Sequence, residues 1–140
     1  MKKGFLILLV GGIILASCKK DAASTAVLNE MTDTTVAKTQ LMGVFMDGPY
    51  GTVTGSAKVY KENNNFTLQL QDVAISNGPD LHVYISKEKL PVNFIDLGKL
   101  KSTMGNQLYD IPGKPDFAAY KYALIHCQQY NHLFGSAVLQ

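Results

Sequence analysis

The chain has 140 residues, with 13 basic side chains, 11 acidic side chains and a formal net charge of +2. All the basic residues are lysines, and arginine is absent. A nucleic-acid-binding protein normally carries a basic stripe with arginines that grip phosphates and base edges, so we exclude that class of protein. The length fits one domain.

The first 17 residues have the pattern of a secretory signal peptide. Lys2 and Lys3 form a positive start, and residues 4–15 form an apolar run without charge. A helix that spans a bilayer needs about 20 apolar residues, so this run is too short to cross a membrane. Its length and flanks instead fit a signal sequence. Residues 1–17 are therefore predicted to be removed on export.

The residues Leu15-Ala16-Ser17-Cys18 match a lipobox, in which an aliphatic residue and two small residues precede a cysteine. Cleavage before Cys18 leaves its thiol for a diacylglycerol and its amine for a further acyl chain. Each buried CH₂ adds about 0.8 kcal/mol of membrane affinity, so two or three chains hold a protein firmly. We expect a lipoprotein of the cell envelope, anchored to a membrane on its periplasmic or cell-surface side.

A polar stretch follows the lipidation site. Residues 19–38 are rich in Ala, Ser, Thr and charged side chains, and their apolar pair is Val27-Leu28. Such a composition predicts a flexible tether. We therefore assign residues 18–39 to the lipidated cysteine and tether, and residues 40–140 to one folded domain.

The rest of the chain alternates apolar and polar residues with the period of a β-strand. An Asn turn at residues 63–65 predicts a hairpin between two of these runs. Short strands separated by Gly, Pro and Asn turns indicate an all-β fold, an antiparallel β-sandwich or barrel-like single domain. Helical turns are expected only within residues 99–108 and 115–119. The expected strands are residues 41–46, 52–60, 66–71, 81–86, 94–97, 120–127 and 132–139.

Six sequence blocks occur in an order that resembles the DM13 domain, a small β-rich module of extracellular proteins. They are residues 52–55, 78–84, 97–101, 105–112, 124–127 and 134–139. The resemblance covers residues 41–140. It implies a β-sandwich with a redox or electron-transfer role centred on the family's single cysteine, which falls on Cys127. The family often has a large aromatic residue before that cysteine, where this chain has His126.

DM13 domains often stand beside DOMON domains, and this sequence contains none. The resemblance therefore implies that any haem-linked electron partner is a separate protein outside the cytoplasm. No cofactor of the domain itself is certain from the sequence.

Two cysteines are present, and lipid attachment at Cys18 leaves Cys127 without a partner for a disulfide. Four residues separate Cys127 from His132, and a hairpin loop of that length would place the two opposite each other. An imidazole there can stabilise a thiolate or take its proton. His126 is a worse partner because neighbours on a strand point to opposite faces. We therefore expect Cys127 and His132 to carry the chemistry.

Two alternatives stay open at this stage. His82, Cys127 and His132 are the ligand types of a cupredoxin-type copper site, although the weak axial methionine would have to come from Met42, Met46 or Met104. The other alternative is a binding or adhesion module without catalytic activity. In that case Cys127 is a buried structural residue that shares its face with Ala123 and Ile125.

Overall fold

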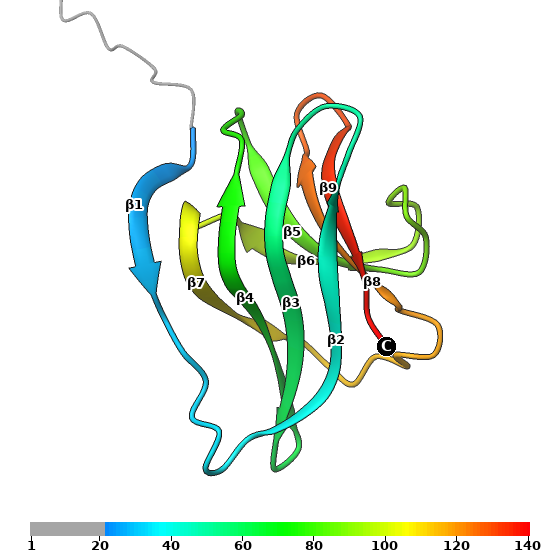
Figure 1. The fold of residues 1–140 in the computed structure, drawn as a ribbon. Helices are drawn as coiled ribbons and strands as arrows, with labels where there is room; N and C mark the ends of the chain where they lie inside the picture. The colour runs from blue at the N-terminus through cyan, green and yellow to red at the C-terminus, as the bar shows by residue number, and fades with distance from the viewer. Residues whose placement is uncertain (1–21) are drawn as a thin grey trace, which may run out of the picture.

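The computed structural model describes residues 22–140 (Figure 1). The predicted signal peptide and Cys18 lie outside the described residues. Within the described range, no helix has the length and apolar character that crossing a membrane requires.

Within residues 22–140, nine strands join into a continuous sheet that curls strongly into a half-barrel (Figure 1), which confirms the all-β prediction. The strand order across the sheet is β1-β7-β4-β3-β2-β9-β8-β5-β6. Every neighbouring pair is antiparallel except β1 and β7. The strands are β1 (Ser24–Asn29), β2 (Lys38–Asp47), β3 (Val53–Glu62), β4 (Asn65–Ile75), β5 (Leu81–Ser86), β6 (Phe94–Lys99), β7 (Ser102–Ile111), β8 (Tyr122–Cys127) and β9 (His132–Val138).

Strand β2 joins the two halves of the sheet. Its first part pairs with β3, and its last residues pair with β9 from Phe45 opposite Ala137 to Asp47 opposite Gly135. At Gly43 a Cβ atom would lie 2.2 Å from the carbonyl oxygen of Val138, so only glycine permits this close approach of the two chain segments. The curled sheet encloses a core of buried apolar side chains, which come from the strands on both sides of β2.

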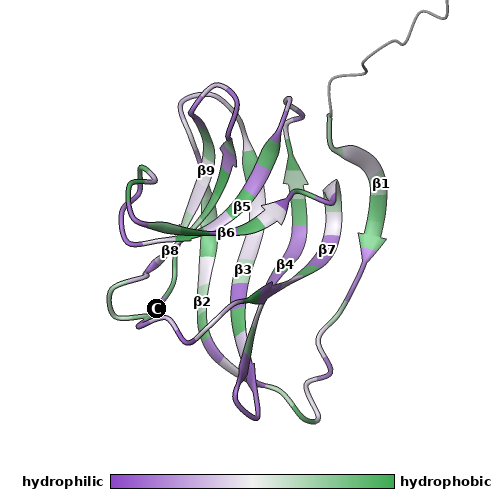
Figure 2. Ribbon diagram, turned by 180° about the vertical axis from the view of Figure 1, so that it is seen from behind, coloured by the Kyte–Doolittle hydropathy of each residue, from purple (hydrophilic) through white to green (hydrophobic). Residues whose placement is uncertain are grey.

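The predicted hairpin across residues 63–65 is confirmed by β3 and β4. Their pairing runs from Glu62 opposite Asn65 back to Val53 opposite Ile75. The turn uses Asn63 at a φ of 53°, a left-handed conformation that Asn tolerates better than most residues. Hydrophilic and hydrophobic residues alternate along both strands, as half-buried strands require (Figure 2).

The expectation of a flexible tether is wrong for its described part, because β1 lies there. This strand runs parallel to β7, with Val27 opposite Met104 and Leu28 opposite Gly105. Gly105 has a φ of 97°, and a Cβ atom on it would lie 2.0 Å from the carbonyl oxygen of Leu28. The partner of β1 is thus distant in sequence and is accommodated by a glycine, so local composition could not reveal the strand.

The helical turn expected within residues 99–108 is also wrong, since β7 occupies most of that segment. Buried polar side chains hide its alternation: Gln107 is fully buried, where its amide oxygen accepts from the Ser102 N–H and its nitrogen donates to the Ser102 carbonyl. Residues 115–119 do hold one turn, closed by the Tyr120 N–H donating to the Asp116 carbonyl at 2.8 Å.

Candidate functional site around Cys127

The hairpin of β8 and β9 places Cys127 directly opposite His132, as the four-residue spacing predicted. The intervening residues 128–131 form the turn, in which Asn131 has a φ of 53°. A bulge between Ile125 and His126 shifts the register just before the end of β8. The backbone arrangement expected for the two residues is therefore confirmed.

The side chain of Cys127 points into the core, on the same face as Ala123 and Ile125. It is only 1% exposed, and it is the free cysteine of the described residues. Its Sγ donates a hydrogen bond to the Pro79 carbonyl oxygen at 3.0 Å, which requires the protonated thiol. A surface turn, residues 77–80, thus covers the thiol, and Pro79 in that turn is itself partly exposed.

The imidazole of His132 is held by aromatic rings. Its ring lies 3.6 Å from the ring of Tyr50, with the two planes within 2° of parallel, and Tyr130 lies at 5.9 Å. Among the described residues, the thiol of Cys127 has its hydrogen bond with Pro79 and none with His132. The two predicted site residues are therefore neighbours in register whose side chains make separate contacts.

His82 lies on the other face of the sheet from the thiol and is bound by two carboxylates. Its Nδ1 lies 2.9 Å from Asp96 Oδ2, and its Nε2 lies 3.3 Å from Asp80 Oδ1. Lys99 Nζ approaches the same Asp80 oxygen at 3.9 Å. Both ring nitrogens of His82 thus have a carboxylate partner, Asp96 from β6 and Asp80 from the turn before β5.

These positions do not fit the copper site that the ligand types suggested. Within residues 22–140, no group of three or more His, Cys, Asp or Glu side chains could hold a metal ion. The candidate axial residues Met42, Met46 and Met104 are exposed, at 46%, 66% and 44%. The structure therefore does not bring His82, Cys127 and His132 together as a ligand set.

A titratable cluster that the sequence did not predict lies on the face opposite Cys127. His126 pairs with His82 across β8 and β5, and its ring lies 5.3 Å from that of Tyr84. Burial, then repulsion from His132 and His82, lowers the pKa of His126, while a hydrogen bond with Asn131 raises it. Burial, followed by the negative charge of Asp96, raises the pKa of Tyr84 to about 12.

His126 is 4% exposed, and its Nδ1 is buried without a hydrogen-bond partner among the described residues. The sequence does contain a signal for this cluster: His82 and Tyr84 alternate with apolar residues in the segment that forms β5, and His126 lies in the segment that forms β8. It was missed because the pairing of β5 with β8 is not visible in the sequence.

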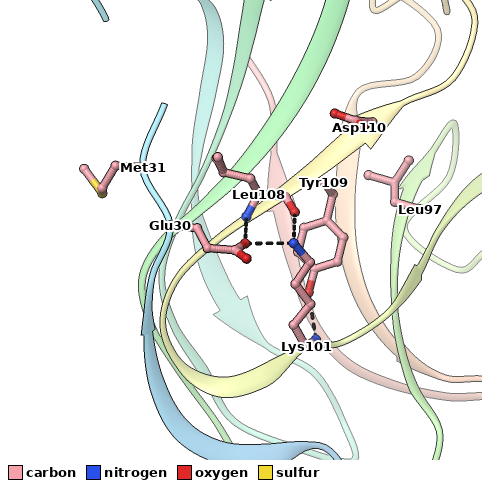
Figure 3. Close-up of a pocket in the computed structure, with 7 residues that line it drawn as sticks. All are labelled: Glu30, Met31, Leu97, Lys101, Leu108, Tyr109 and Asp110. Atoms are coloured by element: carbon pink, nitrogen blue, oxygen red, sulfur yellow. Dashed lines mark hydrogen bonds and ion pairs between the residues drawn. The ribbon is translucent and has the colours of Figure 1, made fainter. Parts of the chain in front are cut away.

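A separate groove of about 610 Å³ lies between the end of β1 and strands β6 and β7 (Figure 3). Lys101 Nζ donates to Glu30 Oε2 at 2.8 Å and to the Leu108 carbonyl at 2.7 Å. The hydrogen bond from Lys101, then that from the Leu108 N–H, lowers the pKa of Glu30. These polar groups satisfy each other and fix β1 to the sheet, and the groove contains none of the predicted site residues.

Comparison with known proteins gives one positive result. Residues 45–139 match the model of the family described as electron transfer DM13. The match covers about two thirds of the chain and includes Cys127, His132 and the titratable cluster. Searches of curated proteins and of solved structures found no match.

Proposed function

The chain belongs to the electron transfer DM13 family, and from this membership we propose that it is a lipoprotein of the cell envelope that exchanges electrons through the thiol of Cys127. The family description supports the redox role. The lipobox at Cys18 supports attachment to a membrane, and the preceding signal sequence supports export. The redox partner is proposed to be another protein outside the cytoplasm.

The observation that carries the proposal is the hydrogen bond between the Cys127 thiol and the Pro79 carbonyl. The thiol ends a core strand, and the residue that covers it belongs to a partly exposed turn. Turns open more readily than core strands, because they bury fewer apolar contacts. Displacement of residues 77–80 would therefore uncover the thiol while the sheet stays intact.

The reaction that fits this site is thiol–disulfide exchange. The sulfur of Cys127 attacks one sulfur of a partner disulfide, a mixed disulfide forms, and the partner's other sulfur leaves as a thiol. The S–S bond of the partner breaks as the new S–S bond forms: the sulfur of Cys127 is oxidised, the leaving sulfur is reduced to a thiol, and the proton of Cys127 ends on that thiol. His132, opposite Cys127 in register, is the proposed carrier of that proton once the thiol has left Pro79.

The test measures how fast Cys127 reacts with a small disulfide reagent in a soluble form of the protein, residues 19–140, at increasing urea concentrations. If the thiol is uncovered by a local opening, the reaction rate of Cys127 should be nearly independent of urea well below the unfolding midpoint, because such an opening exposes little new surface. The variant His132→Ala should slow the reaction, and Cys127→Ser should abolish it. The mass of the N-terminal fragment from exported full-length protein tests lipidation of Cys18 separately.

The burial of Cys127, at 1% exposure, favours a second candidate, a binding module without redox chemistry. In that case the thiol reacts only through global unfolding, and its rate rises with urea as steeply as the unfolding constant does. Cys127→Ser would then change stability and leave the biological role intact. Such a result would overturn the thiol mechanism.

A further inference from the structure

The first described residues are fixed to the turn that covers Cys127. Ala22 forms an antiparallel bridge with Pro79, and Asn77 Nδ2 donates to the Ala23 carbonyl at 3.2 Å. The described chain therefore starts at a defined place on the domain surface, beside residues 77–80.

The distance from this place to the lipid is short. Three residues separate Cys18 from Ala22, and the four Cα–Cα steps from one to the other cover at most about 14 Å even in a fully extended chain. A domain whose surface is bound that close to its anchor has little freedom to turn its start away from the membrane.

Two further turns lie at the same end of the molecule as residues 77–80. Residues 48–51 are linked to it by the Thr52 N–H, which donates to Ser76 Oγ at 2.9 Å. Residues 128–131 are linked by the Gln128 N–H, which donates to the Asp80 carbonyl at 3.0 Å. These connections and the start of β1 stand together at the top of Figure 1. We call these three turns the turn end.

The exposed side chains of the turn end suit a lipid headgroup layer. Tyr50 and Tyr130 are 56% and 49% exposed, and both flank the ring of His132. Tyrosine is enriched at membrane interfaces, where its ring meets apolar matter and its hydroxyl meets water. The carboxylates of this end are engaged within the protein: Asp47 accepts from the Val53 N–H, and Asp80 contacts His82.

The opposite end differs in both position and charge. The β3–β4 turn lies there, at the bottom of Figure 1, and a strand of ten residues such as β3 is about 33 Å long. Exposed charged side chains lie beside this turn, Lys61 and Glu62 before it and Asp110 opposite Thr67, and the turn itself carries the exposed amides of residues 63–65.

We propose that the turn end lies against the headgroups of the membrane that holds the lipid anchor. The Pro79 turn above Cys127 then faces that membrane, and the partner disulfide meets the thiol at the headgroup surface when this turn opens. The proposal rests on the proposed lipidation of Cys18. It commits to one occupant of this surface, a phospholipid bilayer, because the anchored chain enters the domain beside these tyrosines.

The experiment uses full-length exported protein in vesicles of phosphatidylethanolamine and phosphatidylglycerol that contain a headgroup nitroxide lipid. Two variants carry one fluorescent label each, at Gln129→Cys in the turn end or at Asn64→Cys in the β3–β4 turn, both in a Cys127→Ser background. Both sites are exposed turn residues, so they form a matched pair. Nitroxide quenching should be several-fold stronger at position 129 than at position 64.

Equal quenching at the two positions, or stronger quenching at position 64, would overturn the proposal. Mass measurement of the N-terminal fragment is made on the same samples. A lipidated fragment with equal quenching refutes the orientation alone. A fragment without lipid refutes the anchoring on which the orientation depends, so the two failures are distinguishable.

Discussion

The two faces of strands β5 and β8 bury different chemistry. The core face carries apolar residues such as Val83 and Ile125, and Cys127 is among them with its thiol bound to a carbonyl. The outer face carries His82, Tyr84 and His126, which are also nearly inaccessible to solvent. Neighbouring residues of one strand therefore lie in surroundings of opposite polarity.

The difference shows where proton chemistry resides in this domain. On the core face the polar group is a single thiol, and its hydrogen-bond need is met by Pro79. On the outer face the ionisable groups shift one another, since His82 acts on His126 and Asp96 acts on Tyr84. His132, which lies opposite Cys127 in register, also acts on His126. The thiol and the most perturbed titratable groups are thus separated by the sheet itself.

The largest expected effect is loss of core packing on the thiol's face. Ile125 is fully buried, so Ile125→Ala should lower the free energy of unfolding by about 2–5 kcal/mol through lost contacts and a cavity. Urea titration measures the change. Leu124→Ala on the outer face is the matched comparison, since Leu124 is equally buried beside Tyr84. A loss below about 1 kcal/mol in both variants would contradict the two-face description.

A smaller effect is expected from the hydrogen bond between Asp96 and His82 on the outer face. Asp96 binds His82 Nδ1 and accepts from the Gly98 N–H at 2.8 Å. Asp96→Ala should lower the free energy of unfolding by about 1–3 kcal/mol, because it leaves a largely buried imidazole without this partner. Asp110→Ala, at an exposed position, serves as the control and should stay within about 0.5 kcal/mol of the parent.

The third effect appears only as pH changes. The folded pKa of His126 is below its unfolded value, so the unfolded chain binds a proton first as the pH falls. The neutral imidazole makes its full contribution to the free energy of unfolding above the unfolded pKa, near 6.5. This contribution is lost as the pH falls from there toward the folded pKa. His126→Gln should therefore flatten the stability profile below pH 6.5, by at most about 1.4 kcal/mol per pH unit. An unchanged slope in urea titrations would show that other groups cause it.

The smallest effect is expected at the edge of the sheet that β1 forms, away from both faces of β5 and β8. The ion pair of Glu30 with Lys101 is partly exposed, with side chains 39% and 41% accessible. Glu30→Gln should reduce the free energy of unfolding by no more than about 1 kcal/mol. Hydrogen exchange of the β1 amides is the sensitive measurement, and Glu62→Gln is the control. A loss as large as that of Asp96→Ala would place this edge among the main stabilising features.

Local patterns predicted the parts of the fold that depend on neighbours in sequence. Alternation and an Asn turn gave the β3–β4 hairpin, and the four-residue spacing gave the register of Cys127 with His132. Long-range pairing was not predictable in this way. The partner of β1 lies about 78 residues later in β7, and the buried Gln107 disguised that strand as polar.

The same limit applies to the site. The sequence indicated correctly that Cys127 shares its face with Ala123 and Ile125. It could not supply the Pro79 carbonyl, which reaches the thiol from the turn before β5, nor the Tyr50 ring that stacks on His132. The roles of Cys127 and His132 in electron transfer stay predictions.

The pairing of β1 also has a mechanical consequence. This strand lies at the edge of the sheet and has one neighbour, β7, which runs in the same direction. If the domain is anchored through Cys18 as proposed, a force that draws it away from the membrane loads β1 along its own axis. All its interstrand hydrogen bonds then share the load in shear, whereas a perpendicular pull would break them one after another. The parallel edge strand therefore suits a domain that is held from its first residues.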